Sequence, residues 1–186
     1  MRTISVPDYI KHFITTISHR GMADMHVRLS QNLHGYLGYY FCLQTAFGSD
    51  LSPRTVAPAY FFLFARATLD CLAEIFCDFF TLPLLCATIN HTSLTAVFLD
   101  TCAKKKLTGD VADIYVQMCD LDACIPRTNS DICSESSSVE SGAIPEDATL
   151  LSMLTRIDQY TVALLRFCEQ NLEQSALRYA PLPEKP

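Results

Sequence analysis

The chain has 186 residues, of which 49% are hydrophobic, and it carries a formal net charge of −6 with a pI near 5.2. This length suffices for one domain with a sizeable core, and the apolar content excludes a disordered chain. The acidic balance argues against general nucleic-acid binding, which needs a basic face, because the only basic run is Lys104-Lys105-Lys106. An odd count of nine cysteines, without a secretory signal, predicts reduced thiols in a cytoplasmic or nuclear protein.

Helical periodicity begins near the N-terminus. Ser5-Val6-Pro7-Asp8 supplies a capping hydroxyl, a proline and an acid, and the apolar spacing that follows predicts a first helix that ends near Gly21. A second helix is predicted over residues 23–47. Gly35 and Gly38 inside it indicate a close helix contact or a bend, with a ligand clamp as the third reading.

The most apolar stretch of the chain covers residues 60–80 and is long enough to cross a bilayer. Arg66, Asp70, Glu74 and Asp78 nevertheless recur in it every four residues, along one ridge of a helix. Each charge costs about 2.5–3.5 kcal/mol near a bilayer centre, so the stretch is expected to be a core helix over about 57–80. Its acidic ridge, Asp70, Glu74 and Asp78, is either a solvated face or a surface for basic groups. These groups could be Lys104 to Lys106 on the next helix or a partner protein.

Two shorter helices are expected next. The first begins near Thr92 or Ser93 and ends before Gly109, and the second is capped by Asp110 and ends before Pro126. Together with the preceding helices they form the bundle core predicted for residues 1–126.

A change of composition follows the fifth helix. Residues 127–145 are rich in serine and acids, which predicts a flexible acidic loop that cannot bury enough surface to become ordered. Thr128 and Ser137 each precede an acid by three residues, so they are candidate phosphorylation sites.

The final helix is predicted over residues 146–178, with an extended tail at 179–186. Its apolar positions form more than one stripe, so it must bury more than one side. Met153, Tyr160 and Phe167 are candidate contacts with a partner chain, and the alternative is a central helix covered by its own bundle. The fold class expected from all these segments is all-α, a single-domain bundle of about six helices with one flexible acidic loop before the last.

No motif for catalysis, metal binding or cofactor binding is recognised. Cys119, Cys124 and Cys133 come nearest to a zinc site, but their spacing does not give two pairs of ligands. No Walker loop, dinucleotide fingerprint, nucleophile elbow or His-Glu-x-x-His occurs in the sequence. We therefore expect no catalytic residue, no metal and no cofactor.

One stretch resembles a known family. The sequence FFLFARATLDCLAE, residues 61–74, is similar to the buried central helix of Bcl-2-type proteins, in which small residues follow an aromatic run. The resemblance implies an all-α fold and a groove that accepts an amphipathic helix. The overall texture also resembles small accessory or structural proteins of large DNA viruses.

The expected function is a non-enzymatic protein–protein interaction or assembly role, exerted through helical surfaces. The partner would be another protein, in a homo- or hetero-oligomer. The alternatives are a Bcl-2-like regulator that binds an amphipathic helix, and an enzyme with a cryptic cysteine-based site.

Overall fold

The computed structural model of the chain describes residues 5–18, 31, 33–42, 58–82, 89–125 and 147–175. All regular elements in these residues are helical, and no strand occurs among them, which confirms the all-α prediction. The helices are α1 (Val6–Ser18), a helical segment at 33–42, α3 (Pro58–Phe79), α4 (His91–Lys105), α5 (Val111–Cys124) and α7 (Asp147–Gln170). A short 3-10 helix, η3 (Leu172–Gln174), follows α7. The acidic loop expected at 127–145, with Thr128 and Ser137, lies outside the described residues.

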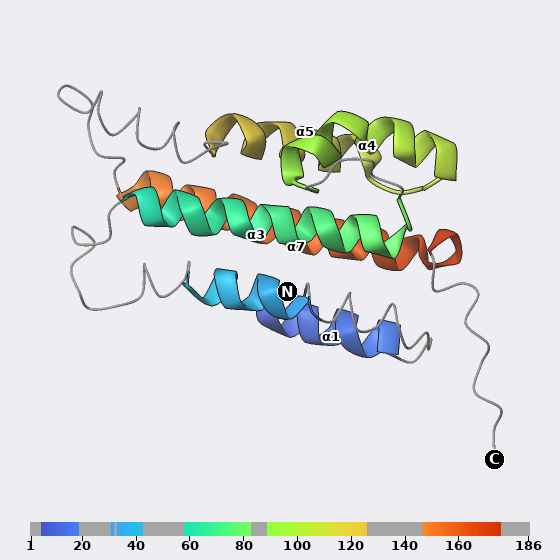
Figure 1. Cartoon of the computed structure of the whole chain (residues 1–186), viewed down its shortest axis with the longest axis horizontal. Coiled ribbons are helices and arrows are strands. Elements are labelled where there is room, and N and C mark those ends of the chain that lie inside the picture. Colours follow the sequence, from blue (N-terminus) through green and yellow to red (C-terminus); the bar gives the residue numbers. More distant parts are fainter. Residues whose placement is uncertain are drawn as a thin grey trace, which may run out of the picture.

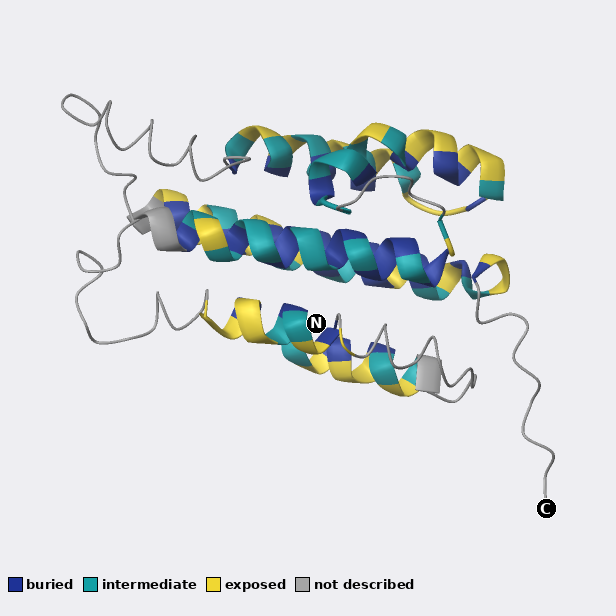
Figure 2. Ribbon diagram, in the orientation of Figure 1, coloured by how far each residue is buried: buried dark blue, intermediate teal, exposed yellow. Residues whose placement is uncertain are grey.

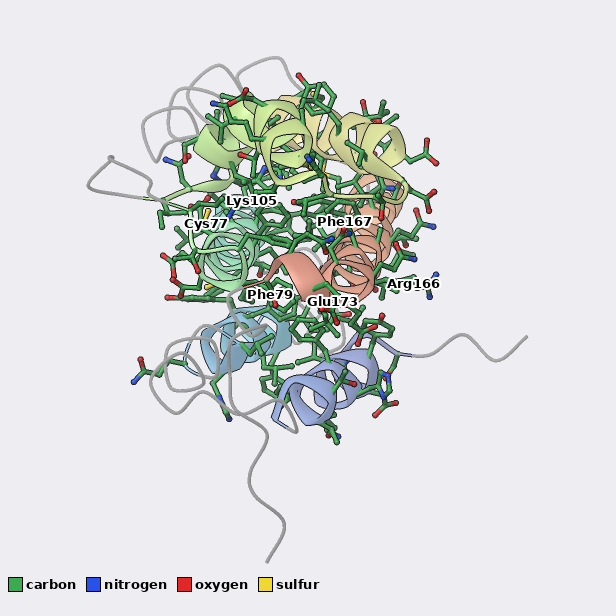
Figure 3. All side chains as sticks on the ribbon, turned by 90° about the vertical axis from the view of Figure 1, so that its right-hand side faces the viewer. Cys77, Phe79, Lys105, Arg166, Phe167 and Glu173 are labelled. Atoms are coloured by element: carbon green, nitrogen blue, oxygen red, sulfur yellow. The ribbon has the colours of Figure 1, made fainter. Side chains whose placement is uncertain are left out.

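The helices stack in three layers (Figure 1). α3 and α7 lie side by side in the middle layer, α4 and α5 cover one side, and α1 and the segment 33–42 cover the other. The end-on view in Figure 3 shows the same order. The two middle helices are therefore covered on opposite sides by their own chain.

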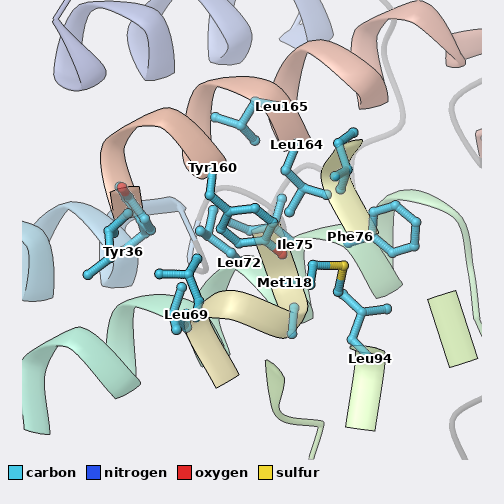
Figure 4. Packing of buried hydrophobic residues seen from close by; sticks show 14 of the residues in the cluster. Tyr36, Leu69, Leu72, Ile75, Phe76, Leu94, Met118, Tyr160, Leu164 and Leu165 are labelled. Carbon is cyan, nitrogen blue, oxygen red and sulfur yellow. The ribbon is translucent and has the colours of Figure 1, made fainter. Parts of the chain in front are cut away.

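The middle layer provides most of the core. α3 buries an unusually large share of its residues, because it meets helices from both outer layers (Figures 2 and 4). Its buried apolar residues are Phe61, Ala65, Leu69, Leu72, Ala73, Ile75, Phe76, Cys77 and Phe79. Within the described residues, no helix combines the length and the apolar character needed to cross a membrane.

The outer layer of α1 and the segment 33–42 is tied to α7 by buried tyrosines. The Tyr40 hydroxyl donates to Asp158 Oδ1 at 2.7 Å, and the Tyr36 and Thr161 hydroxyls lie 2.9 Å apart. Gly35 lies against α3, where a Cβ atom would stand 3.7 Å from Cys71 Sγ. This supports the reading of Gly35 as a close helix contact.

α4 begins at His91, one or two residues before the expected start near Thr92 or Ser93. Its cap is Asn90: the backbone N–H of Ser93 donates to Asn90 Oδ1 at 2.8 Å, and the backbone N–H of Asn90 donates to Ser93 Oγ at 3.1 Å. This reciprocal capping box satisfies two donors that a helix start leaves open. The expected start near Thr92 or Ser93 was thus close, and it missed only that the side-chain amide of Asn90 is the capping group.

The connection between α4 and α5 is short and is held by α7. Asn171, which is buried just after α7, accepts from the backbone N–H of Thr108 and donates to its carbonyl, both at 2.8 Å. Gly109 has φ +121°, a conformation that favours glycine. Asp110 occupies the N-cap position of α5 but makes no capping hydrogen bond through its side chain, in contrast to the prediction.

Candidate functional site

A buried polar cluster joins α3, α4 and α5. Asp122 Oδ1 on α5 lies 3.2 Å from Arg66 Nη1 on α3 and 3.0 Å from His91 Nδ1 at the start of α4. Thr92 Oγ1 donates to the same carboxylate oxygen at 3.0 Å and accepts from Arg66 Nη2 at 2.8 Å. One carboxylate thus holds groups from three helices.

Asp70 extends this cluster along α3. Its Oδ1 lies 3.3 Å from Arg66 Nε and accepts from the backbone N–H of His91 at 2.8 Å. The first N–H groups of a helix have no partner within the helix, so this bond anchors the start of α4 on α3. Asp70 is therefore engaged within its own chain.

The cluster lowers the pKa of Asp122 and is enclosed by the protein. Burial alone would raise the pKa of the Asp122 carboxyl, but hydrogen bonds and charge from His91, with further bonds from Thr95 and Thr92, hold the pKa well below its usual range. The side chain of His91 is 0% exposed and that of Asp122 is 7% exposed. This enclosure favours a structural role, in which the cluster fixes the α4–α5 hairpin to α3.

Two polar atoms beside the cluster are buried without a hydrogen-bond partner among the described residues. They are His91 Nε2 and the Tyr160 hydroxyl oxygen. The two rings meet edge to face, with centroids 5.3 Å apart. Burial raises the pKa of Tyr160 well above its usual value.

The acidic ridge predicted on α3 is only partly a surface. Glu74 and Asp78 are half-buried, and burial, followed by the nearby charges of Asp78 and Asp70, raises the pKa of Glu74. Of the lysine run suggested as its counterpart, Lys104 pairs with Asp100 on its own helix at 2.6 Å. The three acids therefore do not form one uniform open patch.

The candidate contacts on the last helix occupy different environments. Tyr160 and Phe167 are 0% and 1% exposed in the core, while Met153 is half-buried. Figure 3 shows Phe167 turned into the bundle and its neighbour Arg166 turned outward. α7 lies in the middle layer, which corresponds to the alternative of a helix covered by its own chain, and Tyr160 and Phe167 are not surface residues.

The outer side of α4 and α5, which faces away from α3 and α7, is largely exposed (Figure 2). An uncharged strip of residues runs along this side. Its members recur three or four residues apart on each helix, so they share one face. We call this strip the α4–α5 seam: Ala96, Leu99, Ala103, Ala112, Val116, Cys119 and Ala123. Leu99 is 45% exposed and Val116 is 56% exposed.

The seam contains a shallow groove of about 340 Å³ at the end where α4 begins. Its lining is mostly small or apolar and includes Thr95, Ala96, Tyr115, Cys119 and Ala123. Asp122 borders the groove from the buried cluster, so the cluster that fixes the hairpin also fixes the shape of the groove.

The charged residues beside the seam are distributed unevenly. On the α4 side, Asp100 and Lys104 neutralise each other. On the α5 side, Asp113 and Asp120 are exposed and pair with no cation of the described residues. On the side of α5 away from the seam, Asp113 and Arg166 line one hollow, and Asp120 and Arg156 line another.

The described cysteines bear on the alternative of a cysteine-based enzyme. Burial raises the pKa of Cys77 to about 12 and the pKa of Cys102 to about 11, so both thiols stay protonated at neutral pH. Cys119 and Cys124 lie on α5, whereas Cys133 falls outside the described residues. Among the residues that are described, no group of three or more His, Cys, Asp or Glu side chains is placed to hold a metal ion.

Comparisons with protein families, with curated proteins and with solved structures found no match for the chain. The likeness to Bcl-2-type proteins therefore rests on residues 61–74 alone.

Sequence reasoning missed both the buried cluster and the seam. The partners of Asp122 are 31 and 56 residues away in the chain, a distance at which no local pattern operates. A usable signal for the seam did exist: Leu99 and Val116 fall outside the inward stripes of their helices and leave a second apolar face on each.

Proposed function

We propose that the protein is a non-enzymatic interaction or assembly protein that binds another protein through the α4–α5 seam. The observation that carries this proposal is the exposure of Leu99 and Val116 on a strip without charged side chains. Exposed apolar side chains on the same face as a groove with a mostly small or apolar lining favour a contact site for another protein. The role is compatible with a cytoplasmic or nuclear protein.

Rigidity supports the same proposal. The hairpin is fixed to α3 by Asp122 and Asp70 and to the end of α7 by Asn171. A surface that is already ordered loses little conformational freedom when a partner binds. The short side chains of Ala96 and Ala123 would also allow the backbone of a partner to approach closely.

The energetic contribution of the seam can be bounded from its two largest side chains. Complete burial of a Leu or Val side chain contributes about 1.5–3 kcal/mol. Leu99 and Val116 already have about half of their surface covered, so a partner would gain about 1 kcal/mol from each. An aspartate at either position removes this gain and adds the cost of burying a charge.

The test compares Val116→Asp with Leu151→Asp in co-purification from the native host. The two side chains are equally exposed at 56%, but Leu151 lies at the start of α7, outside the seam. We expect the partner to be lost with Val116→Asp and kept with Leu151→Asp. Both variants should show the unfolding midpoint of the wild type. Equal binding by both variants, or loss with Leu151→Asp alone, contradicts the seam as the contact surface.

A further inference from the structure

This inference rests on the proposed function and concerns what occupies the seam. We propose that the occupant is an amphipathic helix with a narrow face of small and aliphatic side chains and with two basic side chains, seven residues apart, along one edge. The dimensions of the seam, its lining and the charges beside it each contribute to this inference.

The shape of the seam suits one helix lying along it. Two helices in contact have their axes about 8–10 Å apart, and the shorter distances need small residues at the contact. The groove is floored by such residues, Ala96, Ala123 and Thr95, and the larger Leu99 and Val116 stand further along the seam. A rounded helical ridge of small and aliphatic side chains fits this surface.

The length of the seam sets the length of the contact. Ala96 to Ala103 on α4 spans about 10.5 Å, and Ala112 to Ala123 on α5 spans about 16.5 Å, at 1.5 Å per residue. A partner would therefore cover the seam with about seven to eleven helical residues, or two to three turns.

The charges beside the seam determine which edge of the partner helix carries basic residues. Asp113 and Asp120 are seven residues apart and lie on one ridge of α5, about 10.5 Å apart along the helix axis. A partner helix beside α5 presents residues i and i+7 at the same spacing. On the opposite border Asp100 pairs with Lys104 at 2.6 Å, and the exposed Lys106 adds a positive charge at the end of α4, so basic residues are favoured along the α5 edge only.

Two further features affect how strongly the α5 edge of the seam attracts a basic segment. The net charge of −6 adds a long-range attraction for a basic segment. Arg166 and Arg156 of α7 reduce this attraction, because they line hollows with Asp113 and Asp120, but among the described residues they form no ion pair with these aspartates. A basic side chain that approaches from the seam meets the carboxylates before it meets the arginines.

The experiment uses the full-length chain and two synthetic helical peptides. Both carry the same Ala/Leu face, and one has Lys at positions i and i+7 where the other has Glu. Fluorescence anisotropy at low salt should show about tenfold tighter binding of the Lys peptide, and most of this preference should vanish at high salt. Asp113→Asn with Asp120→Asn should weaken the Lys peptide about fivefold, while Arg156→Gln should strengthen it.

Protection of Cys119 from alkylation locates the bound peptide. Cys119 lies in the groove, whereas the exposed Cys42 lies in the opposite outer layer and acts as an internal control. The Lys peptide should slow the alkylation of Cys119 and leave that of Cys42 unchanged. Protection of Cys42 instead would overturn the assigned site.

The remaining outcomes separate this inference from the proposed function. If both peptides bind equally and Leu99→Asp weakens both, the charge inference fails and the interaction role stands. If the chain forms a dimer that Val116→Asp dissociates, the occupant is a second copy, and the basic helix is refuted. If neither peptide binds and the host partner is also insensitive to Val116→Asp, both proposals fail.

Discussion

Replacing Asp122 with asparagine tests whether the buried polar cluster holds the α4–α5 hairpin. Asparagine keeps the shape of the side chain but removes the charge that faces Arg66 Nη1 at 3.2 Å and His91 Nδ1 at 3.0 Å. The Arg66 side chain is only 12% exposed, and a buried charge that loses its partner costs about 3–5 kcal/mol. Because Arg66 retains Asp70 at 3.3 Å, we expect a loss of about 2–3 kcal/mol in the free energy of unfolding.

Urea denaturation followed by circular dichroism measures this loss, with Asp120→Asn as the matched control. Asp120 is exposed on the same helix, so its replacement should change the free energy of unfolding by less than about 0.5 kcal/mol. Equal stability of the Asp122→Asn and Asp120→Asn variants would refute the reasoning.

The stability difference between the wild type and the Asp122→Asn variant should also depend on pH. The pKa of Asp122 is lower in the folded chain than the usual value of about 3.9 for an unfolded aspartate. Its stabilising contribution is thus complete above about pH 4 and declines as the pH falls toward the folded-state pKa. The difference between the wild type and Asp122→Asn should stay constant from about pH 5 to 7 and shrink below about pH 4. A difference that instead grows in acid would contradict the assignment.

Three further outcomes follow from the core. Tyr160→Phe removes a buried hydroxyl that has no partner among the described residues, so it should leave the free energy of unfolding unchanged or raise it. Tyr36→Phe instead breaks the hydrogen bond with the Thr161 hydroxyl and should cost about 1 kcal/mol in urea denaturation. Gly38→Ala should stabilise by about 0.5–1 kcal/mol in the same assay, because its added Cβ meets nothing within 4 Å in a helix interior. Cys77 should resist alkylation in the native state while Cys42 reacts, as mass spectrometry after a timed pulse would show; comparable rates would contradict the burial of Cys77.

The helices that could be predicted from the sequence were those with strong local signals. The charge at every fourth residue in 66–78 indicated a core helix, and α3 (Pro58–Phe79) begins and ends within one residue of the range expected. α1 likewise follows the Ser5 start, where the Ser5 hydroxyl bonds Asp8 at 2.6 Å. These features depend on neighbours within one or two turns.

The candidate site depended on information that local patterns lack. No pattern in the sequence singled out Asp122, and only the crossing of α3, α4 and α5 gives it three partners. Tyr160 and Phe167 were read as a second apolar face that a partner could cover. The number of layers decides this question, because a helix in a middle layer is covered on both sides by its own chain.

Site-specific photo-crosslinking in the native host tests the central claim, that the α4–α5 seam is the interaction surface, most directly. A photoreactive residue is placed at Leu99, which is 45% exposed in the seam, or at Leu63, which is 42% exposed on α3. The account predicts one crosslinked partner from position 99, which disappears when Val116→Asp is added, and none of that partner from position 63. Crosslinking of the partner from position 63 but not from position 99 would contradict it.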